Sequence, residues 1–356
     1  MDNIKNILYF YPLPTTFILR DIEILNQNYN VIPYEFKIKV KWKTPFEFFK
    51  QFFFLLLNIR KTDVLMSHFA GYNSLLPAIF GKLFNKPCLI IVAGNDGSKF
   101  PDFNYGNYTK KLLGFCTGKS LQLATHILPV HESLVYQDYN YYEGGMPTQG
   151  YTHFYPKAKK IPFTPVYYGY DIDFFKPNPT VVRKKNSFIT IGNLNDNYAF
   201  KRKGFDMVIA LAKLRPELSF TLVGWDGVKK IEVPDNVELH RYVPINEVPT
   251  LFSQHEFYFQ LSIMEGFPNA LAEAMSCGCI PIGSNVSGIP FIIGETGYIL
   301  NKRDVNLLSN LVDEALIDTR REKLPLLARK RIVENFTYED RKKMFIKIIS
   351  GAYEFY

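Results

Sequence analysis

The strongest constraint on the fold is a series of short apolar runs that alternate with helix-like segments, and this series occurs twice. The first extends from residues 7–11 to residues 126–130, and the second from residues 188–191 to residues 280–282. Strands that alternate with helices are typical of a parallel sheet covered by helices on both faces. The sequence therefore predicts an α/β chain with two Rossmann-like, doubly wound domains that face a central cleft.

The length agrees with two domains, because a single hydrophobic core stops growing at about 250–300 residues and this chain has 356. We expect an N-terminal domain over residues 1–165 and a C-terminal domain over residues 166–335. Residues 336–356 should form a C-terminal helix that packs back on the N-terminal domain. Residues 139–165, rich in Tyr, Gly and Pro, are predicted to be a long loop and linker.

Composition excludes several classes of protein. Hydrophobic residues make up 47% of the chain and charged residues 21%, which is ordinary for a globular protein and argues against disorder. No apolar run reaches the ~18 residues of a membrane span, and the N-terminus lacks the pattern of a cleavable signal. Four cysteines in a chain of this length do not make a disulfide framework. These features predict a cytoplasmic enzyme.

The net charge of +8 is concentrated in the first 165 residues, which hold 18 Lys and Arg against 11 Asp and Glu. Lys37, Lys39, Lys41 and Lys43 would share one face of a strand, and the very apolar segment 45–59 follows them. One interpretation is a basic, aromatic patch that contacts an anionic membrane. The alternative is a lysine-protected edge strand beside a core helix. Nucleic acid is not expected as a partner, because no helix-turn-helix, zinc-finger or RNP pattern accompanies the charge.

The most informative segment is EGFPNALAEAMSCG, residues 265–278. Gly266 and Pro268 should end the preceding strand, and residues 269–277 have the composition of a helix. The first N–H groups of a helix have no intrahelical partner and lie at the positive end of its dipole. The N–H groups of Asn269, Ala270 and Leu271 are therefore predicted to form a phosphate site.

Two glutamates flank this predicted helix start. Glu265 lies in the turn, and Glu273 lies about one turn inside the helix. Such carboxylates can accept hydrogen bonds from vicinal sugar hydroxyls. The alternative is a polar turn residue and an ordinary helix glutamate. That alternative is the weaker one for Glu273, since an unpaired carboxylate in a mostly apolar helix is costly.

A second cluster is Lys201, Arg202 and Lys203, followed by Gly204 and a predicted helix. Three cations at a helix start oppose the helix dipole, so the arrangement makes sense if an anion binds there. We predict a diphosphate held between these cations and the helix start at Asn269. The alternative is a solvated basic loop.

Several segments together resemble family 4 glycosyltransferases. Residues 265–290 resemble the Glu-x7-Glu signature of that family, and residues 192–206 resemble its strand–loop–Lys-Gly element. Residues 168–177 look like its linker between domains, and residues 14–23 resemble an N-terminal element of its lipopolysaccharide and capsule members. The resemblance implies the GT-B fold, a nucleotide diphosphate sugar as donor, transfer with retention of anomeric configuration, no cofactor and no divalent metal.

The resemblance also implies residue roles. Arg202 and Lys203 would contact the donor diphosphate and stabilise the departing nucleotide. Glu265 would contact the transferred sugar, and Glu273 the ribose hydroxyls. The backbone that holds the phosphates and the sugar would come from Phe267, Pro268, Asn269, Ala270 and Leu271.

The sequence departs from the family pattern at two positions. Asn193 stands in the donor site where the family often has Arg, and Arg202 could replace that cation. The frequent His-Gly-x-Asp reads Ala-Gly-Asn-Asp at residues 93–96, so the His proposed to act at the reaction centre is absent. Asp96 remains as a candidate at that centre. His131 is a possible substitute for the missing His, although it could simply begin a helix.

The expected function is transfer of a sugar to a glycan acceptor, lipid-linked or free, in bacterial capsule or lipopolysaccharide synthesis. The enzyme would act in the cytoplasm or peripherally at the inner face of the membrane. One alternative is a nucleotide-sugar epimerase of the same fold. Another is an inactive GT-B-like binding subunit, which the missing His and Arg favour and the intact Glu265, Glu273 and Lys203 oppose.

Overall fold

The computed structural model describes residues 5–38 and 40–355. This part of the chain forms two compact units. Unit 1 comprises the chain up to Asp138, residues Met146–Tyr168 and the chain from Tyr338 onward, and unit 2 comprises Tyr139–Gly145 and Gly169–Thr337. None of the helices formed by the described residues has the length and apolar character needed to span a bilayer.

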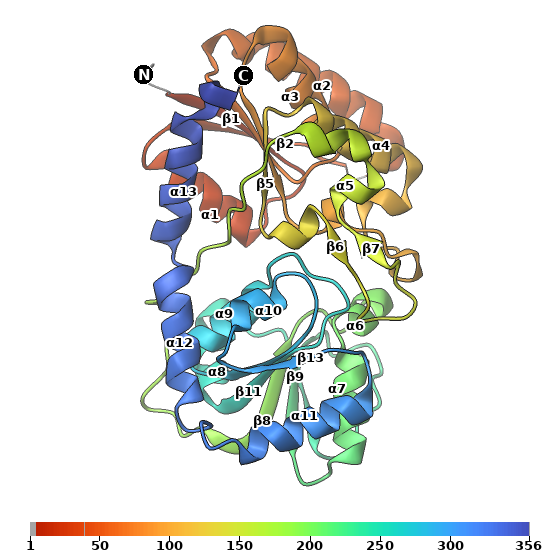
Figure 1. The fold of residues 1–356 in the computed structure, drawn as a ribbon, viewed down its shortest axis with the longest axis vertical. Helices are drawn as coiled ribbons and strands as arrows, with labels where there is room; N and C mark the ends of the chain where they lie inside the picture. Colours follow the sequence, from red (N-terminus) through yellow and green to blue (C-terminus); the bar gives the residue numbers. More distant parts are fainter. Residues whose placement is uncertain (1–4, 39, 356) are drawn as a thin grey trace. The chain divides into compact units, whose positions relative to one another are not determined.

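Unit 1 is built on a five-stranded parallel sheet with the order β2-β1-β3-β4-β5 (Figure 1). The order reverses between β1 and β3, which is the switch point at which doubly wound sheets bind ligands. The strands are β1 (Asn6–Tyr11), β2 (Asn30–Glu35), β3 (Val64–His68), β4 (Cys88–Val92) and β5 (His126–Pro129). The helices are α1 (Thr16–Asn26), α2 (Thr44–Asn58), α3 (Tyr72–Phe84), α4 (Lys111–Leu123), α5 (Tyr151–Phe154) and α13 (Tyr338–Ser350).

Unit 2 is built on a six-stranded parallel sheet with the order β10-β9-β8-β11-β12-β13. Its switch point lies between β8 and β11. The strands are β8 (Lys184–Ile191), β9 (Ser219–Trp225), β10 (Val237–Arg241), β11 (His255–Gln260), β12 (Ile280–Ser284) and β13 (Tyr298–Leu300). The helices are α6 (Asn197–Arg202), α7 (Phe205–Leu214), α8 (Val248–Ser253), α9 (Asn269–Ser276), α10 (Ile289–Ile293), α11 (Val305–Ile317) and α12 (Leu324–Asn335).

The apolar runs form the cores of both sheets. Every residue of β3 and β4 is buried, as expected for strands covered on both faces. In unit 2, Phe188 stacks on Phe257 and Phe220 from the two neighbouring strands, with ring centroids 4.8 and 5.3 Å away. The prediction of an α/β chain with two parallel, Rossmann-like sheets is confirmed.

The predicted lysine-bearing strand is wrong. β2 ends at Glu35, opposite Tyr11 at the end of β1, so the following residues have no strand to pair with. Lys37 lies in non-strand backbone, Lys41–Lys43 form a 3-10 helix, and Lys39 lies outside the described residues. The edge-strand alternative fails for the same reason.

The predicted linker is partly structured. Gln137–Asp138 (β6) pairs with Thr148–Gln149 (β7), and α5 follows, so residues 139–165 are not one uniform loop. Tyr139–Gly145 belongs to unit 2, although the chain enters and leaves this segment from unit 1. Near the C-terminus, α12 lies in unit 2 and α13 in unit 1.

Candidate functional site

The candidate site is formed by two loops at the switch point of unit 2. Residues 192–204 follow β8, and residues 261–268 follow β11. Gly204 joins α6 to α7 with a φ of +83°, and a Cβ atom at this position would collide with the Leu261 carbonyl. Glycine therefore lets the first loop approach the carboxyl end of β11.

Lys203 and Glu265, which the sequence predicts as donor contacts, form an ion pair in this structure. Glu265 also accepts hydrogen bonds from Ser262 Oγ at 3.0 Å and from Gln260 Nε2 at 3.4 Å. Burial alone would raise the pKa of Glu265, but Lys203 and Arg202 outweigh that effect and hold the pKa below its ordinary value. The Glu265 carboxylate is therefore ionised at neutral pH. Its ion pair with Lys203 and its hydrogen bonds from Ser262 and Gln260 hold it in place.

Arg202 contacts the same loop through both its backbone and its side chain. Its carbonyl accepts a hydrogen bond from Ile263 N at 2.7 Å, and its Nη1 donates to Met264 O at 3.4 Å. The predicted opposition to a helix dipole is wrong for Lys201 and Arg202, because these residues lie in the last turn of α6. Cations at a helix C-terminus are favoured by the dipole.

The strand–turn–helix predicted for residues 265–278 is present. Helix α9 starts at Asn269, and Pro268 is its N-cap residue. Asn269 and Ala270 are half-buried at the helix start, whereas Leu271 is buried. Phe267 anchors the preceding turn by packing on Phe336, with the ring centroids 5.5 Å apart.

Two arginines bind the carbonyl groups at the other end of α9. Arg183 Nη2 donates to Cys277 O at 2.9 Å, and Arg329 Nη1 donates to Ser276 O at 2.7 Å. These contacts satisfy carbonyls that a helix C-terminus otherwise leaves unpaired. They therefore fix the axis of α9, and with it the direction of the N–H groups at its start.

Glu273 lies one turn inside α9, and burial raises its pKa to about 7. Among the described residues, no hydrogen bond or ion pair engages its carboxylate. The charge of Glu273 therefore changes close to neutral pH. A partner that donates hydrogen bonds would favour the ionised form.

Asn193 lies on the surface of the first loop. Its Oδ1 accepts a hydrogen bond from Asn195 N at 2.9 Å, which closes a local turn. Leu194, the next residue, is buried and its carbonyl accepts a hydrogen bond from Lys229 Nζ at 3.0 Å. Asn193 thus shapes the loop that leads to Lys203.

The two remaining candidates, Asp96 and His131, lie in unit 1. Asp96 is completely buried and accepts hydrogen bonds from the backbone N–H groups of Ala70, Ala93 and Gly94, each at 2.9 Å. Burial raises the pKa of Asp96 to about 6, although these bonds oppose the shift. Asp96 thus ties the loop after β3 to the loop after β4.

His131 follows β5 and caps a short 3-10 helix, Glu132–Leu134 (η6), by accepting a hydrogen bond from Ser133 N at 3.2 Å. Its Nδ1 also lies 2.9 Å from Ser133 Oγ. Burial lowers the pKa of His131 to about 4, so the ring is neutral at pH 7. This placement matches the helix-start alternative.

Sequence reasoning missed three residues that contact the site loops. Gln260 and Ser262 bind Glu265, and the Tyr139 hydroxyl donates to Ile263 O at 2.8 Å. Polar residues at the end of the apolar run 257–261 were an available signal for the first two. The sequence held no such signal for Tyr139, which is 124 residues away from Ile263.

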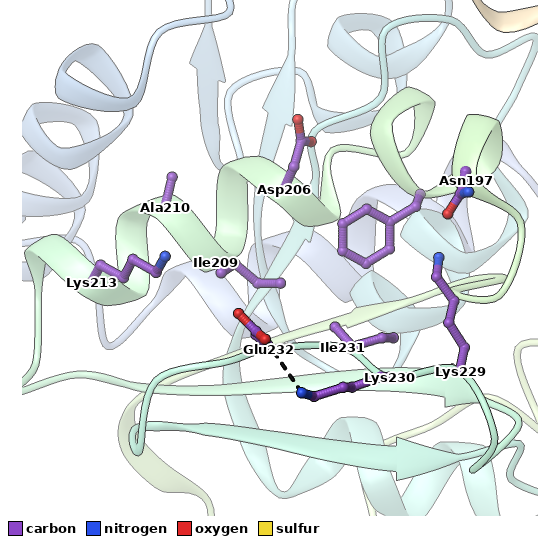
Figure 2. A pocket seen from close by; sticks show the side chains of 10 residues that line it. Asn197, Asp206, Ile209, Ala210, Lys213, Lys229, Lys230, Ile231 and Glu232 are labelled. Atoms are coloured by element: carbon purple, nitrogen blue, oxygen red, sulfur yellow. Dashed lines mark ion pairs between the residues drawn. The ribbon is translucent and has the colours of Figure 1, made fainter.

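A separate pocket of about 400 Å³ opens between α6, α7 and the loop after β9 (Figure 2). Lys230 and Glu232 form an ion pair of 3.6 Å at its edge. The pocket does not include Lys203, Glu265 or Glu273. Its lining residues are Asn197, Phe200, Asp206, Ile209, Ala210, Lys213, Lys229, Lys230, Ile231 and Glu232.

Across residues 5–38 and 40–355, no three His, Cys, Asp or Glu side chains gather in a way that could hold a metal ion.

Comparison with known proteins gives matches in sequence. Residues 171–335 match the model of the family "Glycosyl transferases group 1". O-antigen chain mannosyltransferase B of Escherichia coli is 34% identical over 77 residues, which is 22% of this chain and 20% of that protein. The GDP-mannose-dependent alpha-(1-6)-phosphatidylinositol monomannoside mannosyltransferase of Mycolicibacterium smegmatis is 24% identical over 213 residues, 52% of this chain and 56% of that protein. The matches thus span between about a fifth and just over half of the length of these relatives.

Solved structures match over almost the whole chain. Sucrose-phosphate synthase from Thermosynechococcus elongatus superposes with a TM-score of 0.73 and 13% identity, covering 98% of this chain and 99% of that one. HepE from Anabaena, solved in complex with UDP, gives a TM-score of 0.68 and 13% identity, covering 98% and 100%. The family model thus matches residues 171–335, which is just under half of the chain, and the fold of the chain is GT-B.

Proposed function

We propose that this chain is a retaining glycosyltransferase of family 4 that moves a hexosyl or related sugar from a nucleotide diphosphate sugar to a glycan acceptor. The observation that carries the proposal is the Lys203–Glu265 pair at the switch point of unit 2, with Glu265 four residues before the start of α9. It combines a cation, a fixed carboxylate and helix N–H groups, which are the groups that a sugar diphosphate needs. The family match over residues 171–335 covers all of these groups.

The donor diphosphate would lie between Lys203, Arg202 and the N–H groups of Asn269–Leu271. As the bond to the sugar breaks, negative charge grows on the departing nucleotide diphosphate. Preorganised cations and helix dipoles stabilise such charge without rearranging. Charge that a divalent metal supplies in other transferases would therefore come from side chains here, and we propose transfer without a metal or cofactor.

The two glutamates would divide the recognition of the donor. Glu265, held ionised by Lys203 and oriented by Ser262, would accept hydrogen bonds from the transferred sugar. Glu273, one turn inside α9, would accept bonds from the ribose hydroxyls. Asn193 would shape the loop beside the diphosphate.

The acceptor would bind to the N-terminal domain, residues 1–165, with the C-terminal domain, 166–335, holding the donor. We propose that Asp96 acts there as a positioning residue, because it joins the loops after β3 and β4. His131 would be neutral and near the same strand ends. The acceptor would be a lipid-linked glycan of capsule or lipopolysaccharide synthesis, met by a cytoplasmic enzyme at the inner membrane face. The names of the O-antigen and phosphatidylinositol monomannoside relatives support this class.

The first test is ligand-induced thermal stabilisation with a panel of nucleotides and nucleotide sugars. A ligand at about 100 times its dissociation constant stabilises the native state by about 2.7 kcal/mol, which raises the melting temperature by several degrees. We expect a shift with one base family, and we expect Lys203→Ala to abolish it. Lys201→Ala is the matched control, because Lys201 is an exposed cation two residues away. No shift with any nucleotide would refute the donor site.

Measurement of turnover distinguishes a glycosyltransferase from an epimerase and from an inactive binding subunit. A glycosyltransferase releases nucleoside diphosphate faster when an acceptor is added. Conversion of the nucleotide sugar without acceptor would indicate an epimerase, and nucleotide binding with no conversion would indicate an inactive binding subunit. Lys203→Ala should lower kcat/KM by about 10²–10³-fold if the cation acts on the departing nucleotide.

A further inference from the structure

The outward face of α2 in unit 1 is apolar, where a surface helix normally carries charge. Phe46, Phe49 and Leu57 are 60%, 65% and 78% exposed. Residues three and four apart share one face of a helix, and this spacing places them on one stripe. The remaining exposed apolar residues of α2 and the preceding turn are Trp42, Phe52, Phe53 and Leu56.

The stripe continues onto the end of α3. Phe52 packs edge-on against Phe80 at 5.5 Å, and Phe80 stacks on Phe84 at 5.6 Å. Phe84 is 43% exposed and its neighbour Leu83 is 70% exposed. We call the exposed apolar residues of segments 42–57 and 83–84 the α2 surface. Contiguous exposed apolar patches of this kind mark interaction sites.

Basic residues interrupt the α2 surface and flank its segments in the sequence. Lys50 lies within the stripe, and its carboxylate partner, Glu47, is largely buried at 12% side-chain exposure. Between residues 42 and 84 the sequence holds five basic residues and two acidic ones, Glu47 and Asp63. The basic residues are Lys43, Lys50, Arg60, Lys61 and Lys82.

The combination of exposed apolar and basic residues indicates which partner the α2 surface binds. A second copy of this chain would bring the same basic patch against itself, and like charges in an interface cost free energy. Protein interfaces are also depleted in lysine. An interfacial helix instead combines phenylalanine, tryptophan and leucine on one face with basic residues around them, and long lysine side chains reach out to charged headgroups.

We propose that the α2 surface docks on an anionic bilayer, with α2 lying in the plane of the interface and its basic residues on the lipid headgroups. This contact would bring unit 1 to the layer in which a lipid-linked acceptor resides. That purpose rests on the proposed function, whereas the binding itself does not.

The test is co-sedimentation of the full chain with vesicles of phosphatidylcholine alone or with about 30% phosphatidylglycerol. We expect at least about tenfold tighter binding to the anionic vesicles. The double variant F49S/L57S should lose at least about tenfold of that affinity, and R60E/K61E should lose the preference for anionic lipid. The matched control is L307S/I317S, which removes two exposed apolar side chains from unit 2.

Equal sedimentation of F49S/L57S and the unchanged protein would overturn the proposal. A dimer seen by light scattering without lipid, and lost in F49S/L57S, would assign the surface to a second copy instead. The nucleotide-induced melting shift should be the same in F49S/L57S as in the unchanged protein. Loss of vesicle binding with an intact shift therefore tests docking, and loss of the shift in Lys203→Ala tests the proposed function.

Discussion

At the level of a single residue, Glu273 combines a stability cost with the proposed role of binding the donor ribose. Burial raises its pKa to about 7, above the ordinary 4.5 of a glutamate. Between these values the unfolded chain is ionised while the folded chain still binds the proton, so stability falls as pH rises from 4.5 to about 7. Above pH 7 the folded protein contains an ionised, half-buried carboxylate, which hydrogen-bond donors on a ligand would stabilise.

We therefore expect nucleotide affinity to increase as pH rises through about 7, because the proposed hydrogen bonds from the ribose hydroxyls would favour the ionised form of Glu273. Glu273→Gln should stabilise the protein without nucleotide at pH 8 by on the order of 2 kcal/mol. The same variant should bind nucleotide more weakly and without the pH dependence. Calorimetric titration with UDP or GDP at pH 6, 7 and 8 measures this, with the exposed Glu314→Gln as control. An unchanged pH dependence in Glu273→Gln would contradict the assignment.

Tyr139 reaches the site from a distant part of the chain. Its hydroxyl donates to Ile263 O, in the loop that carries Glu265, and the side chain is buried. Removal of one such hydrogen bond costs about 1 kcal/mol, and the freed Ile263 carbonyl lets the loop move.

Tyr139→Phe should therefore weaken nucleotide binding about fivefold, which corresponds to about 1 kcal/mol. Tyr136→Phe is the control, because the exposed Tyr136 hydroxyl binds only Asp138 in the described structure. Equal nucleotide affinity in the two variants would mean that Tyr139 does not position the loop.

At the scale of the element, α13 is joined to unit 1 by a buried ion pair. Arg341 makes bonds of 2.6 and 2.7 Å to the two carboxylate oxygens of Asp21 in α1. His68 lies 3.3 Å from the same carboxylate, and both side chains are almost fully buried. Burial would raise the pKa of Asp21, but Arg341 and His68 hold it below the ordinary value, while burial lowers the pKa of His68. Because the pKa values of Asp21 and His68 are both lower in the folded protein than in the unfolded chain, the unfolded chain binds more protons. Unit 1 therefore becomes less stable as pH falls.

Arg341→Met should destabilise the protein by about 3–5 kcal/mol, because it leaves the buried Asp21 carboxylate without its arginine partner. The double variant D21L/R341M should recover part of this loss, since no charge then remains in the core. Lys330→Ala breaks an exposed pair of 3.6 Å with Glu334 and should cost less than about 1 kcal/mol. Urea denaturation checks all three. An equal loss in Arg341→Met and Lys330→Ala would rule out a structural role for the buried pair.

At the scale of the whole molecule, the two proposed ligands belong to different units. Hydrogen exchange should therefore separate them, because local protection follows local binding. UDP or GDP should give its largest protection in residues 192–204 and 261–273, and anionic vesicles in residues 42–60. The largest nucleotide-dependent protection in unit 1 would contradict the placement of the donor in residues 166–335.

Local sequence patterns predicted most of the helices and strands, and they predicted the helix start at Asn269 that forms part of the candidate site. The helix predicted after Gly204 is α7, and the predicted helix 269–277 is α9 to within one residue. Strand alternation and a helix start are properties of neighbouring residues, so a sequence displays them. The prediction of a lysine-bearing strand was wrong because a strand needs a neighbouring strand to pair with. β1 ends at Tyr11, so the residues after Glu35 have no such partner.

The sequence by itself determined the α/β class, the two sheets, and the residue types able to bind a sugar diphosphate. Only the tertiary structure decided which residues far apart in the sequence contact one another. Lys203 and Glu265 are 62 residues apart, and Arg341 and Asp21 are 320 apart. It also decided that the stripe of α2 is exposed rather than buried. The physical reason is that hydrophobic periodicity records what one segment needs to bury, whereas strand order and packing select which distant segments satisfy it.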